Sequence, residues 1–413
     1  MSRPTLMRLA TLPLRAIVSP PLVKLQLPAD KLQCPFSSLL VLSSKFCTFP
    51  STDEIAISET KRSPVDNKIE SRFFGVKQFG KLELKIPISV TISSLNPQTY
   101  PEMNKASICI LYTGEDKDSI SPTKLSALTK LYDLSVDLKE ETDLTVGLVT
   151  SIQHLPLTCR LYLPLKFDIG LEVEGDVEIS NMESQTIRVR QIASNGGVCK
   201  LRNVKTRNMA VLWRDGDIIC ETGLQGDIYL TNTGEGKIQA DKLQGQNIKC
   251  ETEAGVMNFS SVYSDECSFI TESANVELGS CHGKCEIKVG QGNVTINSID
   301  GDLSTEVEKG CVKAHLTRHG QVNIECREGD IQLEIPGNTE TSLSLRGNTV
   351  ECDERLNVQN IEKTSTDNGI KYTGHITSQD SSATIQASTH QGAVQLLCKD
   401  WFSSIINKLQ HQK

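Results

Sequence analysis

Between Cys159 and Pro336 the chain alternates apolar and polar residues in short segments, and each segment begins with a small residue, usually glycine. Typical segments are Gly226-Asp-Ile-Tyr-Leu, Gly292-Asn-Val-Thr-Ile and Gly329-Asp-Ile-Gln-Leu. An apolar period of two residues is typical of β-strands and argues against a helix, whose period is 3.6 residues. The pattern therefore predicts a series of short strands.

The spacing of the segments indicates how these strands are arranged. Neighbouring glycines lie nine or ten residues apart, with a double step where a copy is degenerate. A strand of four or five residues cannot bury its apolar face alone, so successive copies must stack. Hairpins usually need longer strands and paired turn residues such as Asn-Gly. We therefore predict an all-β, single-stranded solenoid in which two copies, about 19 residues, form one coil. The marker glycines are Gly175, Gly216, Gly226, Gly236, Gly283, Gly292, Gly301, Gly320 and Gly329, with looser copies at Gly245, Gly255 and Gly310.

The alternation also predicts which side chains fill the core. Apolar residues two and four positions after each glycine are expected to point inward, and the polar residues between them outward. Among outward positions of the repeats, Tyr229 is the only obvious aromatic residue. The expected core residues are Val177, Ile179, Ile218, Cys220, Ile228, Leu230, Ile248, Cys250, Cys267, Phe269, Val276, Leu278, Cys285, Ile287, Val294, Ile296, Val322, Ile324, Cys326, Ile331 and Leu333.

Weaker patterns flank the repeats at 159–336. Residues 71–158 predict a small β-rich N-terminal cap, with strands at 81–86 and 107–111 and a short helix that Ser121 and Pro122 begin. Residues 337–398 continue the solenoid in degenerate form. Residues 399–413 predict a short C-terminal helix with Trp401 and Leu409 on its apolar side. A stack of strands has two open ends. We expect the N-terminal cap at 71–158 to cover one end and this helix to cover the other.

The N-terminal segment indicates where in the cell the protein is located. Residues 1–50 contain Arg3, Arg8 and Arg15 but no acidic residue before Asp30, which is typical of a mitochondrial presequence. A secretory signal fits less well because Arg15 and several prolines interrupt its apolar core. The other alternative is a disordered tail that carries no targeting signal. Residues 51–70 are expected to form a polar linker. We therefore expect a mitochondrial location, with the cytoplasm as the alternative and secretion less favoured.

Charge and cysteine content narrow the class of protein. The net charge is −8, and no basic stripe follows the N-terminal segment, so a nucleic-acid partner is not expected. No apolar run approaches the roughly 18 residues of a membrane-spanning helix. The 14 cysteines are spread along the chain, and several occupy inward positions. Reduced, buried thiols are therefore expected in preference to a disulfide framework.

Three groups of polar residues resemble parts of binding sites. A series of aspartates follows the turn glycines and could form a calcium-binding column, but aspartate after glycine usually accepts a hydrogen bond from nearby backbone N–H groups. Cys281, His282 and Cys285 resemble half of a zinc site, yet no second pair lies at a suitable interval. His315 and His319, with Cys311 nearby, are expected on the surface or in turns. The aspartates are Asp176, Asp217, Asp227, Asp302 and Asp330.

Motifs for catalysis or cofactor binding do not occur in this sequence. No phosphate-binding loop, nucleophile elbow or dinucleotide fingerprint is present, and isolated G-x-G matches follow from the glycine period. We therefore assign no catalytic, cofactor-binding or metal-ligating residue and expect no cofactor.

The run that begins at Cys159 resembles a known family. Its sequence is Cys-Arg-Leu-Tyr-Leu-Pro-Leu-Lys-Phe-Asp-Ile-Gly-Leu-Glu-Val-Glu-Gly-Asp-Val-Glu-Ile, and Ser194-Asn-Gly-Gly-Val and the glycine segments follow. Together they are similar to the putative-adhesin β-solenoid family, over about half of the chain from Leu161 to about Pro336. The layout is also similar to that of an uncharacterised animal member. The resemblance implies a right-handed β-helix-like fold and brings no catalytic residues.

These observations favour a non-enzymatic, adhesin-like β-solenoid that acts as an interaction or scaffold protein for an unidentified protein partner. The alternative is a carbohydrate-binding or carbohydrate-active β-helix. That alternative predicts clustered carboxylates and aromatic platforms along one face, whereas the outward positions are poor in aromatic residues.

Overall fold

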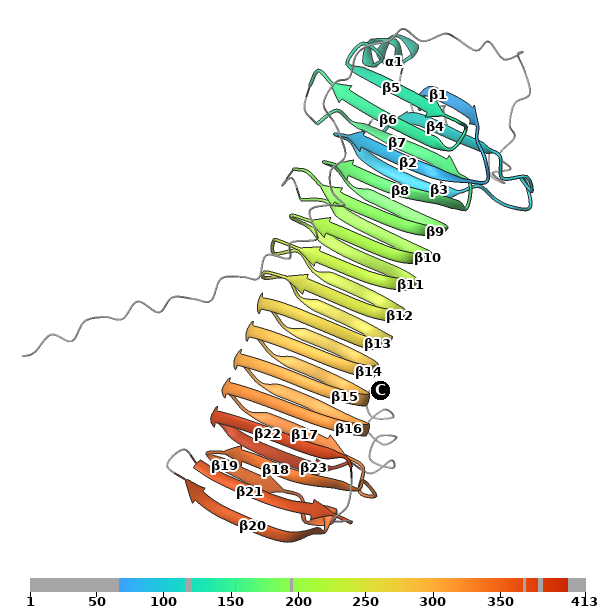
Figure 1. The fold of residues 1–413 in the computed structure, drawn as a ribbon. Helices are drawn as coiled ribbons and strands as arrows, with labels where there is room; N and C mark the ends of the chain where they lie inside the picture. The colour runs from blue at the N-terminus through green and yellow to red at the C-terminus, as the bar shows by residue number, and fades with distance from the viewer. Residues whose placement is uncertain are drawn as a thin grey trace, which may run out of the picture. The chain divides into compact units, whose positions relative to one another are not determined.

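The computed structural model describes residues 67–115, 121–152, 154–193, 196–366, 369–377 and 382–399. The expected targeting segment at 1–50, most of the expected linker and the expected C-terminal helix beyond Lys399 lie outside these ranges, and the mitochondrial location stays a prediction. Within the described residues, 23 strands are joined in one hydrogen-bonded sheet and accompanied by one short α-helix (Figure 1). The expected all-β solenoid is therefore confirmed.

Eight long strands form the regular part of the solenoid, and each is one coil that folds over near its middle. Neighbouring coils pair in parallel: Ile218 lies beside Ile238, Ile238 beside Met257 and Val276 beside Val294, which gives steps of 20, 19 and 18 residues. These steps confirm two sequence copies per coil, and the parallel pairing contradicts hairpins. The strands are β9 (Val177–Gln191), β10 (Val198–Trp213), β11 (Asp217–Asn232), β12 (Ile238–Thr252), β13 (Met257–Ser273), β14 (Val276–Gln291), β15 (Val294–Lys309) and β16 (Val312–Glu328).

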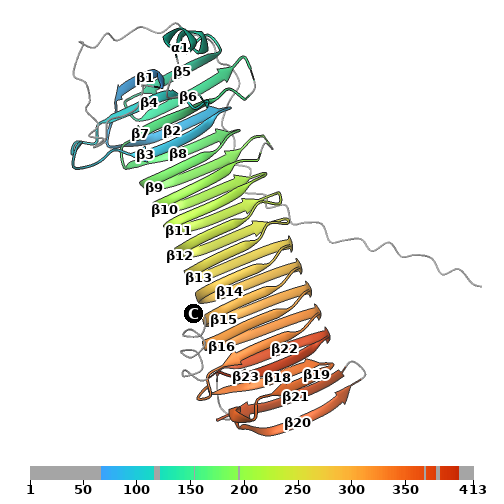
Figure 2. The same cartoon turned by 180° about the vertical axis from the view of Figure 1, so that it is seen from behind.

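Each coil has two sides that face one another across the core. In β14, for example, the first side runs from Val276 to Cys281, the chain folds over at Gly283, and the second side runs from Cys285 to Val289. We call the fold within a coil the mid-coil bend, and the connection to the following coil, such as that at Gly292, the coil-to-coil turn. Figures 1 and 2 show β9 to β16 stacked in chain order in both views.

The core confirms the predicted inward positions. All 21 residues named above are at most 3% exposed, and the Phe259 and Phe269 rings meet across the core with centroids 4.8 Å apart. A further buried residue on each first side, just before the bend, was not predicted. In every coil but the last, it follows the preceding core residue by three or four positions, as Leu224 follows Cys220, which breaks the two-residue period; in β16, Leu316 follows Ala314 by two. These residues are Met182, Val204, Leu224, Leu243, Val262, Cys281, Ile299 and Leu316.

The N-terminal cap region contains the predicted strands and helix. The strand expected at 81–86 is β2, the strand expected at 107–111 is β4, and the side chain of Ser121 caps helix α1 by accepting a hydrogen bond from the backbone N–H of Lys124. Strand β1 already begins at Lys68, inside the expected linker. The elements are β1 (Lys68–Gly75), β2 (Phe79–Ile86), β3 (Ser89–Ser94), β4 (Lys105–Tyr112), α1 (Pro122–Leu128), β5 (Tyr132–Lys139), β6 (Asp143–Thr150), β7 (Leu157–Leu163) and β8 (Lys166–Val173).

Two strands of the N-terminal cap region are inserted into the solenoid itself. Strand β2 pairs in parallel with β6 and β8, and β3 pairs in parallel with β7 and β9. Residues 79–94 therefore form a coil between strands that come later in the chain, and strand pairing is continuous across the expected domain boundary at 158. Antiparallel pairs β1–β4, β4–β7 and β5–β6 close this end of the stack.

The C-terminal strands repeat this insertion. Strand β22 pairs in parallel with β16 and β18, and β23 pairs in parallel with β17 and β19. Strands β18, β21 and β20 then close the stack in antiparallel order. The elements are β17 (Ile331–Ile335), β18 (Thr341–Gly347), β19 (Thr349–Cys352), a 3₁₀ turn (Glu354–Leu356), β20 (Val358–Thr366), β21 (Gly369–Ile376), β22 (Thr384–Gln391) and β23 (Ala393–Cys398).

Candidate functional site

The five aspartates after turn glycines are divided between the two connections of the coil. Asp176, Asp217 and Asp330 lie at coil-to-coil turns, whereas Asp227 and Asp302 lie at mid-coil bends. In each of them Oδ1 accepts a hydrogen bond of 2.8–3.0 Å from a backbone N–H of the next coil in the stack. This confirms the interpretation as turn residues. Because the carboxylates lie in two rows and are bound to backbone, they form no single calcium-binding column.

The Cys281–Cys285 segment crosses a mid-coil bend, so its side chains separate. The thiols of Cys281 and Cys285 point into the core, where the two residues are at most 1% exposed. The His282 ring points outward. The buried Cys267 of the preceding coil joins the two thiols, and all three sulfur atoms lie within 4.8 Å of one another. Sequence spacing alone did not reveal this third cysteine.

His315 and His319 do not form a site together. Nδ1 of His315 lies 3.0 Å from the carbonyl oxygen of Asn297, and Nε2 of His319 lies 3.0 Å from Oγ1 of Thr341. Both rings are half-buried rather than fully on the surface, and burial lowers the pKa of each imidazole. Cys311 is exposed. His319 pairs with Gly301 at a mid-coil bend and His315 is partly exposed, which agrees with the expectation of surface or turn residues.

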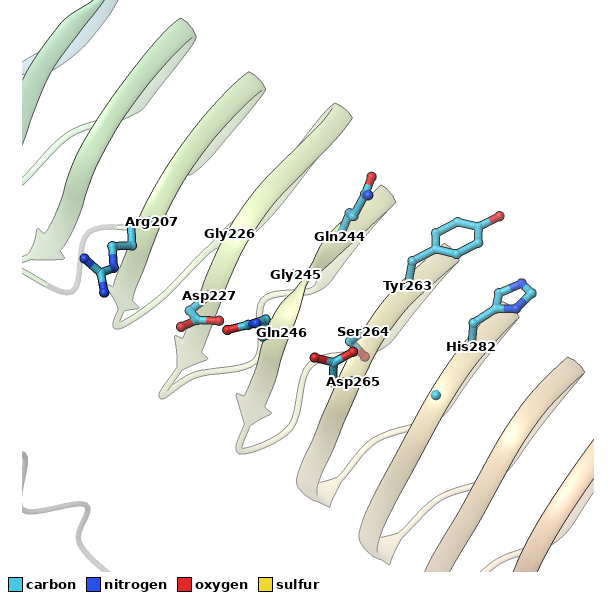
Figure 3. Close-up of a pocket in the computed structure, with 11 residues that line it drawn as sticks. Arg207, Gly226, Asp227, Gln244, Gly245, Gln246, Tyr263, Ser264, Asp265 and His282 are labelled. Atoms are coloured by element: carbon cyan, nitrogen blue, oxygen red, sulfur yellow. The ribbon is translucent and has the colours of Figure 1, made fainter.

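A groove of about 620 Å³ follows the mid-coil bends of β10 to β14. Its floor contains Gly226, Gly245, Ser264 and Gly283, and the three glycines add no side chain there. Figure 3 shows the two rims: one carries Gln244, Tyr263 and His282, and the other carries Arg207, Asp227, Gln246 and Asp265. The groove therefore results from glycine in the bend and polar or aromatic side chains on both of its flanks.

Consecutive coils place a connected row of side chains on one rim. Strand pairing aligns Gln244 with Tyr263, Tyr263 with His282 and His282 with Asp300. The Tyr263 and His282 rings stack with centroids 4.6 Å apart and planes at 10°, and Nδ1 of His282 lies 3.4 Å from Oδ2 of Asp300.

Arg318 extends this row to the next coil. Its guanidinium group donates two hydrogen bonds of 2.7 Å to Asp300 and lowers the pKa of that carboxyl group. At the other end of the row, Nζ of Lys242 lies 5.2 Å from the centroid of the Tyr263 ring. The rim therefore carries a stacked Tyr263–His282 pair between Lys242 and the Arg318–Asp300 ion pair.

A second groove of about 570 Å³ continues the first toward β8 and β2. Gly226 lines both grooves, and the second is lined further by Phe79, Lys166, Glu183 and Lys205. Phe79 is 64% exposed. We call the two together the bend groove; it extends from Phe79 at one end to Tyr263 and His282 at the other.

The sequence predicted neither the groove nor its aromatic rim. Tyr263 is 40% exposed, so the expectation that Tyr229 is the only obvious outward aromatic residue was wrong. Tyr263 and His282 occupy equivalent positions of successive coils, and an alignment of the repeats at the bend would have placed them in one row. In the described part of the chain, no helix is long and apolar enough to cross a membrane.

Comparison with known proteins supports the resemblance over part of the chain. The family model described as Toastrack DUF4097 matches residues 222–397, from within β11 to within β23. The match begins later than the resemblance noted in the sequence and includes the degenerate segment after residue 336. The family resemblance and the solenoid fold therefore agree over this region.

Several solved bacterial structures are similar to the chain. A putative adhesin from Parabacteroides distasonis is 9% identical, with a TM-score of 0.37 and coverage of 61% of this chain and 96% of that chain. A putative adhesin from Parabacteroides merdae is 10% identical, with a TM-score of 0.37 and coverage of 79% and 95%. A putative lipid binding protein from Parabacteroides distasonis is 13% identical, with a TM-score of 0.28 and coverage of 63% and 97%.

Proposed function

We propose that this Toastrack-like chain is a non-enzymatic, adhesin-like interaction protein and that the bend groove binds its protein partner. The observation that carries the proposal is the groove itself, which crosses several coils and has a floor rich in glycine. Where glycine forms the floor, an extended segment of a partner can approach the backbone closely. The stacked Tyr263 and His282 rings supply a rigid apolar contact beside the charged rims, as binding surfaces commonly do.

The side chains of the rim support binding rather than catalysis. In a catalytic triad, a nucleophilic side chain lies beside an imidazole that an aspartate orients. His282 instead has Asp300 on one side and the face of the Tyr263 ring on the other. Asp300 is in turn held by Arg318. These contacts fix the positions of the side chains, which favours recognition of a partner.

The carbohydrate alternative gains no support from the bend groove. It predicted clustered carboxylates and aromatic platforms along one face. The groove has two separate exposed aromatic residues, Phe79 and Tyr263, at opposite ends. The five aspartates that follow the turn glycines accept hydrogen bonds from backbone N–H groups.

Site-specific photocrosslinking tests the proposal. A photoreactive amino acid is placed at Tyr263, in the groove, or at Tyr229, an outward tyrosine of β11 with nearly the same exposure, 43% against 40%. After irradiation in cells, adducts are identified by mass spectrometry. We expect position 263 to yield a discrete protein adduct and position 229 to yield at least tenfold less of it.

A charge substitution in the groove provides the second arm. Arg207→Glu reverses a rim charge without removing a core contact, so we expect the 263 adduct to decrease while the melting temperature stays the same. Equal adducts at positions 229 and 263, or a stable 263 adduct that Arg207→Glu leaves unchanged, would contradict a binding role for the groove.

A further inference from the structure

Three cysteine thiols meet in the core beneath one end of the bend groove. Cys267 and Cys285 are paired residues of adjacent coils, so their side chains lie one above the other on the second side. Cys281 faces them from the first side, and its Sγ lies 3.5 Å from Sγ of Cys267. Each of the three residues is at most 3% exposed.

The mid-coil bend at Gly283 produces this arrangement. Gly283 has a φ of +103°, and a Cβ at this position would lie 1.8 Å from the carbonyl oxygen of Ser264. The chain can therefore reverse tightly between Cys281 and Cys285, and both side chains point inward on opposite sides of the bend. Among the described residues, these three form the one group of cysteine, histidine and acidic side chains with convergent ligand atoms.

Ser264 adds an oxygen atom to the same place. Its Oγ is buried, has no well-formed hydrogen bond among the described residues and lies close to the Cys267 thiol. The site therefore has a fourth polar atom beside the three sulfur atoms.

We propose that Cys267, Cys281 and Cys285 bind one Zn²⁺ ion through their sulfur atoms, with the Ser264 hydroxyl group as the fourth donor. Thiolate sulfur is a ligand that zinc prefers, and structural zinc sites are four-coordinate. Three thiolates and Zn²⁺ leave a net charge of −1, whereas Cu⁺ in the same site would leave −2 in an apolar core. Burial of excess charge is unfavourable, so the divalent ion fits better.

The distances suit a zinc site after small side-chain adjustments. A Zn–S distance of about 2.3 Å places the sulfur atoms about 3.8 Å apart in a tetrahedral site. The observed sulfur atoms include a pair at 3.5 Å, and none of the three separations exceeds 4.8 Å. Zinc binds cysteine as the thiolate, so binding of the ion releases thiol protons to solvent.

The full chain, expressed with added Zn²⁺ and purified under reducing conditions, tests the site. We expect one zinc per chain by inductively coupled plasma mass spectrometry, and less than one tenth of that in Cys267→Ala, Cys281→Ala and Cys285→Ala. Cys199→Ala, which also replaces a fully buried cysteine, is expected to keep one zinc. Ser264→Ala is expected to keep the three sulfur ligands and bind about tenfold more weakly.

Two further measurements separate metal binding from loss of fold. Cd²⁺ added to the metal-free, reduced chain should produce sulfur-to-metal charge-transfer absorption in wild type and in Cys199→Ala but not in Cys285→Ala, whose far-ultraviolet circular dichroism should match that of wild type. Because zinc displaces thiol protons, the apparent Zn²⁺ association constant should rise with pH near neutrality. A zinc-free wild-type chain that gives no Cd²⁺ absorption, or equal zinc in wild type and all three cysteine variants, would overturn the proposal.

Discussion

Thr305 places a hydroxyl group in the core where neighbouring coils place methyl groups. It pairs with Ile287 on one side and Ile324 on the other, and it is 1% exposed. Its Oγ1 has no hydrogen-bond partner among the described residues. A buried polar group in this state costs about 1–3 kcal/mol relative to a paired one. The solenoid thus tolerates a local loss of stability because many other coils contribute to its core.

Valine at this position should stabilise the chain. Thr305→Val keeps the branched shape and removes the unpaired hydroxyl group, so we expect the free energy of unfolding to rise by about 1–2 kcal/mol, measured by urea denaturation. Thr389→Val is the matched control, because Oγ1 of Thr389 donates a hydrogen bond of 2.8 Å to the carbonyl oxygen of Gly329. That variant should lose about 1–3 kcal/mol. Equal effects in the two variants would show that hydrogen bonding does not decide stability at these threonines.

The turns between coils explain the glycine period of the sequence. Gly310 has a φ of +144°, and a Cβ there would lie 1.9 Å from the carbonyl oxygen of Gly292 in the preceding coil. Gly329 stands in the same relation to Gly310, at 1.8 Å. Because successive turns stack backbone against backbone, a side chain at these positions would force the coils apart. The period therefore reflects close stacking as much as the conformational freedom of single turns.

Alanine at a stacked turn should be much more harmful than at an open turn. Gly310→Ala combines a left-handed backbone with a steric clash, and we expect a loss of about 3–5 kcal/mol in the free energy of unfolding. Gly196→Ala is the comparison: its φ is +71°, but nothing lies within 4 Å of the added Cβ. Its expected loss is about 1–2 kcal/mol. Thermal unfolding followed by circular dichroism would measure both, and similar losses would exclude stacking as the cause of the period.

The repeat was predictable because each copy carries its own signal. Glycine followed by apolar residues at two alternating positions identifies the strand, its inward side chains and the turn. The residues beside the mid-coil bend were less predictable, since Cys281 follows Leu278 by three positions and so departs from the alternation. The contacts between coils depend on the register in which neighbouring strands pair, and the repeated sequence segments do not determine that register. The row formed by Tyr263 and His282 and the cluster around Cys267 were missed for this reason.

In the complete stack of strands, the order in space differs from the order in the chain at both ends. Residues 79–94 form a coil between strands of residues 143–191, and residues 384–398 form a coil between β16–β17 and β18–β19. The antiparallel strands beyond these coils cover the open edges. Sequence patterns could not predict the insertions, because β2 and β22 resemble any other strand of the solenoid.

Deletion of the inserted C-terminal coil should cause aggregation, although the coil lies near the end of the chain. Deletion of residues 384–413 leaves the second side of β16 and strand β18 without their parallel partner β22. We expect this variant to aggregate, because exposed strand edges pair with other chains. Deletion of residues 400–413 keeps all described strands and isolates the contribution of the segment expected to form a cap. Size-exclusion chromatography with light scattering would compare the two, and a monomeric, folded 384–413 deletion would contradict the role of this coil.

The inserted coils also constrain how a newly made chain can fold on the ribosome. Strand β2 leaves the ribosome before β8, so it must wait for about 80 further residues before that neighbour exists. The same holds for β16, whose partner β22 is synthesised about 60 residues later. An incomplete chain that ends before residue 384 therefore retains exposed edges of the kind that chaperones and proteases recognise in unfinished proteins. Because strands made early pair with strands made late, the fold is stable only after both have been translated. Products of premature termination should therefore be removed before they accumulate.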